Sequence, residues 1–417
     1  MVAALGIPVD IDEFFRPFDT ALGRSQTRLR ARQYAMSLML EIEHKDCQKL
    51  ADHIPGMRRE LFRNLLNTSH WDRQGVDNAR VVDILGCSEF SVPDLMSAIR
   101  RRAVLEIDDT SHARKGPCVD DVQRQYCGQL GKVESCRVVV TSHIACGFEH
   151  APLFHDSYTP EGQCTQKHPF RDKPTIALDQ LRRLKQLNPT LVCALPVVSD
   201  AWYGSNPNFR GGLEDLGLSF VLATKGNGHY FLAEPGHQLP KSTQPLERFV
   251  TALKPDDFKR VSYPVSTGYR EVRYVHEVIA RPKGETRDYR LVLSTTNPSH
   301  PTAENTDFLL AKLPEEAKPD DIVALYGQRN WIEVFYRTAK TRLGLSQVQV
   351  YSRHGQERHF SLVFAAYTYA WKKGRSLQAD QLEAAKKNGT RQSDGSSVIS
   401  DARSPEPPRS VAAATGS

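Results

Sequence analysis

The sequence lacks any apolar stretch long enough to cross a membrane. Its longest one, LVCALPVV at 191–198, has the length of a strand, whereas a transmembrane helix needs about 18 apolar residues or more. The first residues, MVAALGIPVDIDEFF, also lack the basic start of a secretory signal and become acidic early. These two absences predict a protein of the cytoplasm with no membrane partner.

Paired cysteines and a strong charge of one sign are missing as well. The eight cysteines include no CxxC pair, and no histidines follow them at zinc-finger spacing, so a zinc site is not expected. Without a secretory signal, they are best interpreted as thiols in a reducing compartment rather than as disulfides. The formal net charge of +6 over 417 residues permits a polyanionic partner but does not require one.

The composition that is present is that of a globular protein, with 40% hydrophobic and 25% charged residues, and the length suggests two or three domains. Residues 1–102 contain several stretches with helical apolar spacing, separated by short polar turns, and predict a helical domain. This region is nearly neutral, yet its arginines cluster, which indicates either ordinary helix surface or contacts to phosphate. The arginines that we expect to contact a polyanion are Arg28, Arg32, Arg58 and Arg59, with Arg24, Arg30 and Arg63 nearby.

The pattern changes at residue 103. Strand-like stretches and amphipathic helices follow in the order β-β-β-α-β-α-β through residue 224, which predicts the first part of a layered α/β domain at 103–224. Residues 225–305 contain further strand-like stretches with turn breaks and predict a β-rich insertion. The α/β domain is expected to resume at 306–372. Residues 373–417 become polar and rich in Ser and Pro, which predicts a disordered tail.

Carboxylates follow two of the expected strands. AVLEID ends in Asp108, with Asp109 beside it, and TLVCALPVVSD ends in Asp200. Side chains at the carboxyl ends of strands in an open α/β sheet converge on one crevice. A single aspartate in such a position is more commonly a helix N-cap or a turn residue. Two of them in one domain favour a shared site.

A third carboxylate lies in the stretch YGQRNWIEVFYRTAK, residues 326–340, which predicts one amphipathic helix. At about 100° per residue, the side chains of Arg329, Glu333 and Lys340 leave the helix within about 60° of Tyr326. Phe335 lies on the opposite side. The common interpretation of such a stripe is a solvated face with i,i+4 ion pairs. The apolar residues around the stripe favour a site that handles phosphate and metal instead.

Three carboxylates that converge from distant parts of a chain need cations to compensate their charge. Two divalent ions about 3.5–4 Å apart would do so, and hard oxygen ligands suit Mg²⁺ or Mn²⁺. We therefore expect Asp108, Asp200 and Glu333 to bind two such ions. A metal pair of this kind activates a water or a 3′-hydroxyl for displacement at phosphorus.

These residues carry a resemblance to the DDE transposases of bacterial insertion sequences. Tyr326, Arg329, Glu333 and Lys340 match the Tyr-two-Arg-three-Glu-six-Lys signature of one branch, and LGL at 343–345 and RHFSLVFAAY at 358–367 continue the pattern. EIDDTSHARKG resembles the segment of the first aspartate, followed by RQYCGQLGKVESC. SDAWYGSNPNFRGGLEDLGLSFVLAT resembles the block of the second. The likeness covers roughly residues 20–370.

The resemblance implies an α/β fold with an RNase H-like catalytic core, a β-rich insertion and an N-terminal helical DNA-binding domain. It implies a catalytic triad of Asp108, Asp200 and Glu333, with Asp109 as an ambiguous neighbour, and roles in positioning DNA phosphates for Tyr326, Arg329 and Lys340. The expected partner is double-stranded DNA, both the ends of the element and the target. We expect a homodimer in the DNA complex, because two ends must be held together, in a protein associated with the nucleoid when it binds DNA.

Two features depart from the family pattern or stay open. His112 stands where an apolar or aromatic residue is more usual, and Trp202 is suited either to stacking on a displaced base or to packing under the loop after Asp200. The function expected is cut-and-paste transposition. The alternatives are a domesticated or inactive DNA-binding protein of the same fold, and an RNase H-like nuclease that hydrolyses nucleic acid without strand transfer.

Overall fold

The computed structural model describes residues 8–114, 119–128, 130–166, 168–266 and 269–389. The described residues up to Tyr369 form one compact unit, and those from Ala370 on belong to a second. The α-helices are α1 (Val9–Phe15), α2 (Asp19–Leu22), α3 (Ser25–Leu38), α4 (Cys47–Asp52), α5 (Arg59–Asn67), α6 (Arg73–Leu85), α7 (Leu95–Arg101), α8 (Lys173–Leu187), α9 (Pro189–Ala194), α10 (Ala201–Gly204), α11 (Pro207–Asp215), α12 (Leu246–Thr251), α13 (Pro319–Tyr326), α14 (Asn330–Arg342) and α15 (Arg353–Gly389).

The strands are β1 (Ala103–Ala113), β2 (Gln123–Cys127), β3 (Lys132–Cys146), β4 (Glu149–Ser157), β5 (Val197–Ser199), β6 (Phe220–Thr224), β7 (His229–Ala233), β8 (Gln244–Pro245), β9 (Lys259–Ser266), β10 (Tyr269–Pro282), β11 (Tyr289–Thr295) and β12 (Thr306–Lys312). Short 3₁₀ turns are η2 (Arg16–Phe18), η3 (Glu161–Gln163), η4 (Pro255–Asp257) and η5 (Gly327–Arg329).

One large mixed sheet organises the chain. The strand order in the described residues is β2-β3-β1-β5-β6-β12-β11-β10-β7-β8, with β4 paired to β3 and β9 to β10. β1 is antiparallel to β3 and parallel to β5, and β5 is parallel to β6. The expected α/β class is therefore confirmed, as a mixed α/β fold with a large mixed sheet. The short strand β2 is an addition that the sequence pattern did not predict.

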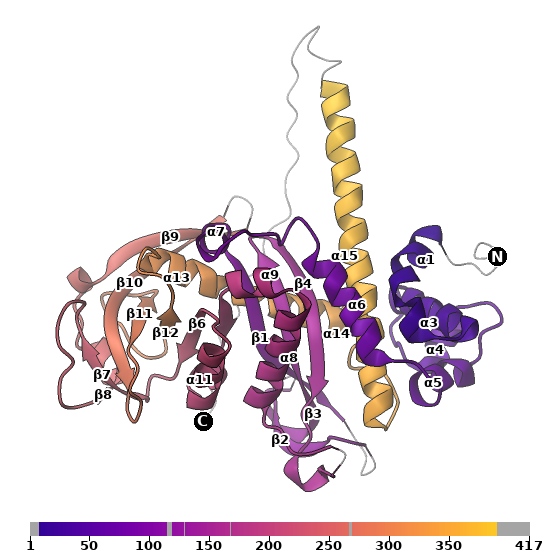
Figure 1. Cartoon of the computed structure of the whole chain (residues 1–417), viewed down its shortest axis with the longest axis horizontal. Helices are drawn as coiled ribbons and strands as arrows, with labels where there is room; N and C mark the ends of the chain where they lie inside the picture. The colour runs from indigo at the N-terminus through magenta and orange to yellow at the C-terminus, as the bar shows by residue number, and fades with distance from the viewer. Residues whose placement is uncertain (1–7, 115–118, 129, 167, 267–268, 390–417) are drawn as a thin grey trace. The chain divides into compact units, whose positions relative to one another are not determined.

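The segment expected to be an insertion forms β7 to β11, which extend the same sheet. β12 pairs antiparallel with β6 from Phe308↔Thr224 to Lys312↔Phe220, and β11, β10 and β7 follow outward from it. Figure 1 shows these strands continuing the sheet on the left of the view. Since backbone hydrogen bonds run across the junction, this part of the chain is anchored to the α/β part through the sheet itself.

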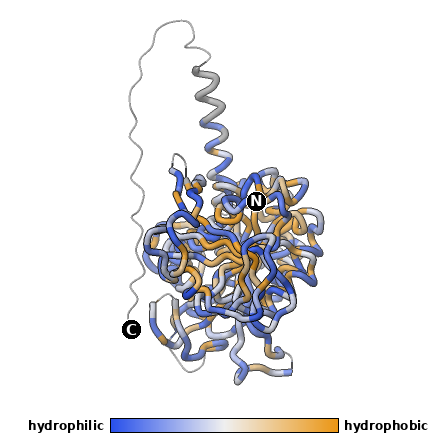
Figure 2. Tube along the Cα trace, turned by 90° about the vertical axis from the view of Figure 1, so that its left-hand side faces the viewer, coloured by the Kyte–Doolittle hydropathy of each residue, from blue (hydrophilic) through white to orange (hydrophobic). Residues whose placement is uncertain are grey.

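Helices cover both faces of the sheet beside β1. Along β1, side chains alternate between the faces, so that Asp109 faces Lys173 of α8 while Asp108 faces the turn before α14. Helix α8 lies over the centre of the sheet in Figure 1. The apolar segments gather in the interior, as Figure 2 shows. The helix α14 buries Phe335, whose ring meets those of Phe364 and Tyr367 edge-on at 4.9 Å.

The N-terminal helices do not have a core of their own. Phe15, Tyr34 and Phe62 belong to one hydrophobic cluster with Phe335 of α14 and Phe360 of α15. Each fully buried side chain of this size stabilises the fold by about 1.5–3 kcal/mol, so this shared cluster ties the start of the chain firmly to its later helices. The expected helical domain at 1–102 is thus helical but packed into the larger unit.

Two expectations about helices are corrected. The single helix expected at 326–340 is interrupted, because α13 ends at Tyr326 and η5 separates it from α14. At Gly327 in this turn, a Cβ would lie only 3.0 Å from the Tyr263 ring of β9, so the backbone passes close to that ring. The disordered tail expected at 373–417 is also wrong in its first part. Helix α15 continues through Gly389, as the run of Leu, Gln, Ala and Lys in this segment favours, and 390–417 lie outside the described residues.

No helix in the described part of the chain combines the length and the apolar character that crossing a bilayer requires.

Candidate active site

Asp108 and Asp200 lie next to each other where the parallel pairing of β1 and β5 ends, in the middle of the strand order. We call this place the acidic edge. β1 and β5 pair in parallel up to Ile107 and Ser199. Asp108 is the next residue of β1, which continues to Ala113 instead of ending at Asp108 as expected, and Asp200 is the first residue after β5. Adjacent strands are about 4.8 Å apart, and residues in parallel register point to the same face. The carboxylate of Asp200 accepts hydrogen bonds from the amides of Trp202 and Tyr203, so it also caps α10. Asp200 therefore both follows a strand and caps a helix, the two alternatives that the sequence left open.

Glu333 is linked to Asp108 by Arg329, which forms ion pairs with both. The guanidinium of Arg329 lies 2.9 Å from a carboxylate oxygen of Glu333, one helical turn away, and 3.6 Å from Asp108. The i,i+4 spacing expected from the sequence therefore forms an ion pair. Glu333 is about half exposed, with 49% of its side-chain surface accessible. One cation thus bridges a carboxylate of the sheet and a carboxylate of the helix.

The charges at this edge are not balanced. Burial raises the pKa of Asp108 to about 8, the neighbouring Asp200 adds to the rise, and Arg329 opposes it. Burial alone would lower the pKa of Arg329, but the carboxylates of Asp108 and Glu333 raise it overall. Within the described residues, Asp200 forms no ion pair. The site therefore holds more negative charge than its own cations neutralise, which is the condition for binding a further cation.

Asp109 occupies a different environment from Asp108. Its carboxylate pairs with Lys173 at 3.0 Å and lies 3.5 Å from the hydroxyl of Tyr203, on the α8 face of the sheet. Burial raises the pKa of Asp109, and Lys173 opposes part of this rise. Because it has a dedicated cation and points away from Arg329, Asp109 is the weaker candidate for the first acid.

Tyr326 and Lys340 flank the acids from two sides. Tyr326 is the last residue of α13. Burial raises the pKa of its phenol, Arg329 opposes this rise, and the charges of Asp200 and Asp108 add to it. The ammonium of Lys340 donates to the backbone oxygen of Ser111 on β1 at 3.4 Å. Burial lowers the pKa of Lys340, while Asp108 opposes this change. The four residues of the Tyr-Arg-Glu-Lys signature thus lie around the second half of β1 even though the helix that was expected to carry them is broken.

Sequence reasoning missed several polar residues of this edge. Tyr336 donates to or accepts from Thr141 at 2.5 Å, and the charge of Asp108 contributes to the raised pKa of this buried phenol. Glu106, two residues before Asp108 and on the same face, is fully buried 3.4 Å from His143. Asp307 of β12 pairs with Arg273 at 3.4 Å. Of these residues, Glu106 alone could have been predicted, because side chains two residues apart in a strand point to the same face.

A cavity of about 470 Å³ adjoins the acids. It runs between Ala201, the residue after Asp200, and Tyr326, and Lys225, Asn227 and Asp307 also line it. A groove of this size beside a set of carboxylates can receive part of a polymer that passes the site.

Carboxylate oxygens of this kind suit Mg²⁺ or Mn²⁺. As they stand, no three His, Cys, Asp or Glu side chains of the described residues are grouped closely enough to hold a metal ion together. Arg329 contacts both Asp108 and Glu333. Its positive charge therefore partly neutralises the two carboxylates that a metal ion would otherwise bind. The donor atoms are of the type that a divalent ion binds, but the described residues do not bring three of them together.

The arginines expected to contact a polyanion separate into two kinds. Arg32 is only 5% exposed and forms ion pairs with Asp12 at 2.7 Å and Asp19 at 2.8 Å, so its guanidinium is held by these two acids. Arg28 is partly buried and donates to the backbone of Gly23. Arg58 and Arg59 are exposed.

His112 and Trp202 also have definite surroundings. His112 is buried, stacks on Phe360 with ring centroids 5.4 Å apart, and hydrogen-bonds Ser346 at 2.8 Å, so it packs as an aromatic residue would. Trp202 is 43% exposed, and the ammonium of Lys173 lies 4.9 Å from its ring centroid.

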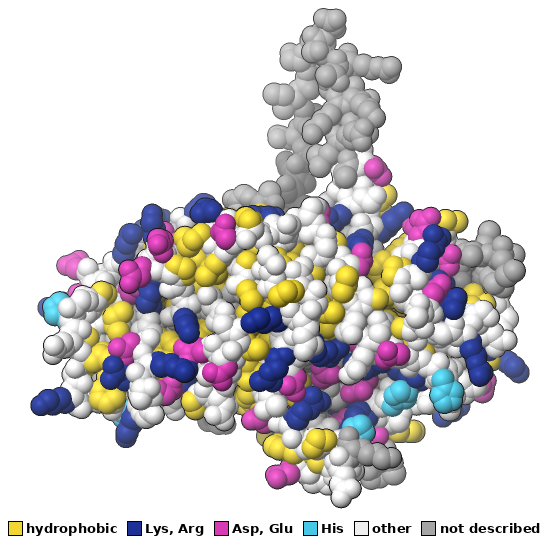
Figure 3. Space-filling model, in the orientation of Figure 1, with side chains coloured by type: hydrophobic (Ala, Val, Ile, Leu, Met, Phe, Trp, Pro, Cys, Tyr) yellow, Lys and Arg dark blue, Asp and Glu magenta, His cyan; other side chains and the backbone are white. Residues whose placement is uncertain are grey.

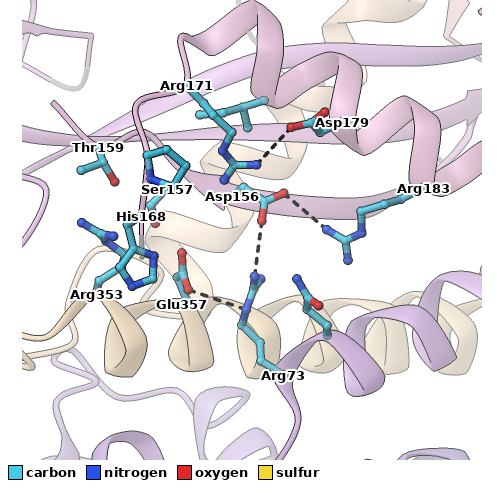
Figure 4. A pocket seen from close by; sticks show the side chains of 13 residues that line it. Arg73, Asp156, Ser157, Thr159, His168, Arg171, Asp179, Arg183, Arg353 and Glu357 are labelled. Atoms are coloured by element: carbon cyan, nitrogen blue, oxygen red, sulfur yellow. Dashed lines mark hydrogen bonds and ion pairs between the residues drawn. The ribbon is translucent and has the colours of Figure 1, made fainter. Parts of the chain in front are cut away.

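A second charged cluster lies between α6, β4, α8 and α15, and Figure 4 shows it from close by. Asp156 stands between Arg73 at 3.3 Å and Arg183 at 3.5 Å, and Arg73 also contacts Glu357 and the buried Asp77. These residues line or adjoin a cavity of about 500 Å³. Arginines and carboxylates face one another throughout this cluster and form ion pairs with one another.

Comparison with known proteins identifies the family of the chain. Residues 17–262 match the family described as DDE superfamily endonuclease, and residues 174–369 match the transposase DDE domain. Since the first match spans more than half of the chain, the chain belongs to the DDE superfamily of endonucleases. Among individual proteins, it is 28% identical over 312 residues to a probable transposase for insertion sequence element IS701 from Microchaete diplosiphon, which covers 74% of this chain and 73% of the relative.

Proposed function

We propose that this chain is the transposase of an insertion sequence element, and that it cleaves the DNA ends of that element and joins them to a target by cut-and-paste transposition. The observation that supports the proposal is that Arg329 contacts both Asp108 and Glu333, which lie far apart in the chain, while Asp200 follows the strand that pairs with the strand of Asp108. The similarity to a probable insertion sequence transposase supports the same activity. The domain proposed to hold the acids is RNase H-like.

In this proposal Asp108, Asp200 and Glu333 hold two divalent ions. When bound, such ions activate the attacking oxygen and stabilise the leaving oxygen at phosphorus. The carboxyl of Asp108, with its pKa near 8, must lose its proton for this role, and a cation beside it favours that loss.

The residues of the chain itself act on the DNA. Arg329 pairs with the acids in the free protein, and a phosphate of the DNA competes for its guanidinium, because bidentate contacts to phosphate are strong. Its departure leaves Glu333 free to act as a ligand. Tyr326 and Lys340 orient the phosphates on either side of the reacting one, and the adjoining cavity receives the neighbouring nucleotides.

Binding of the element ends is assigned to exposed arginines, including Arg58 and Arg59, and a dimer holds two ends together. Such contacts release counterions, so the affinity should fall as salt rises.

A strand-transfer assay tests the proposal. Purified protein is incubated with Mg²⁺, a target plasmid and duplexes copied from the inverted repeats that flank the gene. Joined products with the 3′ ends of the duplex in the target support transposition. Hydrolysis without joining would assign the chain to nucleases, and binding without cleavage to DNA-binding proteins of the same fold.

A further inference from the structure

A cavity of about 540 Å³ at the start of α3 has the chemistry of an anion site. It is lined by Arg24, Ser25, Gln26, Thr27, Arg30, Thr68, Ser69 and His70. Its volume is within the range of ligand pockets. Two arginines, one histidine and four hydroxyl residues line it, and no carboxylate does. The two cavities described above each have at least one acid in their walls. So does a third cavity, which lies beside β7 and is lined by Glu285.

The arginines of this cavity are not neutralised. Arg30 donates only to the amide oxygen of Gln26, at 3.3 Å, and Arg24 has no side-chain partner among the described residues. Their neighbours on the same helix differ, since Arg32 pairs with two aspartates and Arg28 lies 3.8 Å from Asp19. The sequence cluster of four arginines therefore divides into an inner pair held by acids and an outer pair that faces the cavity.

The backbone adds donors to the same place. Arg24 is the N-cap of the 14-residue helix α3, and no side chain caps the helix there. The first amides of a helix lack intrahelical acceptors, and the helix dipole favours an anion beside them. Thr27 supplies an independent sign of a ligand, because it is only 6% exposed, lines the cavity, and its hydroxyl has no partner within the described residues.

We propose that this cavity binds one phosphate of a DNA backbone, through Arg24, Arg30, the hydroxyl of Thr27 and the first amides of α3. The assignment to DNA rests on the proposed function. On the face shown in Figure 3, basic and acidic side chains are interspersed. The contact carries no sequence information and serves to fix the register of the protein on its duplex.

The test is fluorescence anisotropy with a labelled duplex of the element end, at several salt concentrations, using the full chain. Arg24→Gln combined with Arg30→Gln should weaken binding about tenfold and lower the salt slope by about 1, as for one lost phosphate contact. The matched control is Arg182→Gln with Arg281→Gln, which removes two exposed arginines that pair with Asp179 and Asp288. The control should bind as the wild type does.

Three results would overturn the inference. An unchanged affinity and slope in the Arg24/Arg30 variant, with wild-type binding intact, would reject the cavity while leaving the proposed function standing. Tight calorimetric binding of inorganic phosphate that this variant loses, with no effect on the duplex, would reassign the cavity to free anions. A wild-type protein that binds no duplex would reject the proposed function, and this inference with it. Unchanged melting of the variant excludes misfolding, and Thr27→Val, which keeps the side-chain shape, should weaken duplex binding in the same direction.

Discussion

The acidic edge of β1 and β5 and the charged cluster around Asp156 both bury carboxylates beside arginines, yet their balance differs. Around Asp156 three acids, Asp77, Asp156 and Glu357, meet the cations Arg73, Arg80 and Arg183. At the acidic edge, Asp108 and Glu333 share one arginine. Balanced charges satisfy one another and hold elements together, whereas an excess of one sign has to be met from outside. The proposed catalytic site therefore differs from the cluster around Asp156 in its excess of negative charge, and not in the number of its charged residues.

The largest effect is expected at the acids. Asp108→Asn, Asp200→Asn and Glu333→Gln should each lower DNA cleavage by about 100-fold or more, the range for loss of a catalytic group, while they spare binding of the element end. Cleavage of the end duplex and anisotropy with the same duplex provide the two measurements. Asp109→Asn should have the milder effect, because Asp109 pairs with Lys173. If Asp109→Asn stopped cleavage and Asp108→Asn did not, the assignment would move by one residue.

The balanced cluster should respond in stability. Arg73→Ala leaves the fully buried Asp77 without its nearest arginine, and breaking such a pair costs about 3 kcal/mol or more. Urea unfolding of the wild type and the variant measures the difference. The control is Arg182→Ala on the surface, whose pair with Asp179 is worth under about 1 kcal/mol. Equal losses for the two variants would remove the distinction between the two clusters.

Lys340 should matter for the reaction more than for the fold. Lys340→Ala removes a cation from the end of β1, and strand transfer from pre-cleaved ends should fall about tenfold, as for one lost charged contact. Lys340→Arg keeps the charge and should retain much of the rate. Melting temperatures accompany the rates. A Lys340→Ala protein that melts much earlier but transfers normally per folded molecule would make this lysine structural.

A smaller effect is expected in the pH dependence of stability. The pKa of Asp108 is about 8 in the folded chain and about 3.9 in an unfolded one, so the folded chain binds more protons between these values. This group therefore makes stability fall as pH rises from about 4 to about 8. In metal-free buffer, Asp108→Asn should make the decline in melting temperature between pH 5 and 8 shallower. The exposed Asp288→Asn serves as control, and parallel curves for Asp108→Asn and wild type would speak against a buried, uncompensated Asp108.

The sequence allowed the acids to be found because their signals are local. Apolar runs that end at Asp108 and Asp200 are visible without a structure, and the Arg329–Glu333 pair follows from one helical turn. The strand bounds were less accurate, because β1 continues to Ala113 and the run before Asp200 forms α9 and the short β5. The α/β class followed from the alternation of strands and helices. The role of each acid, and of the helices at 1–102 in DNA binding, stays a prediction.

What the sequence could not reveal depends on contacts between distant segments. Arg32 appears to be an ordinary member of a basic cluster until Asp12 and Asp19 fold back onto it. The turn before α14 passes close to a ring from β9, and the extension of the sheet by β12 depends on pairing with β6. Such long-range pairings leave no periodic pattern in the residues that make them.

The central claim is that Asp108, Asp200 and Glu333 form one site whose excess negative charge is met by divalent ions. Calorimetric titration of the metal-free protein with Mn²⁺, in the presence of the end duplex, tests it most directly. The account predicts saturable binding by the wild type and by Asp109→Asn, and binding that is strongly weakened in Asp108→Asn, Asp200→Asn and Glu333→Gln. Equal Mn²⁺ binding by all five proteins, or its loss only in Asp109→Asn, would contradict the account.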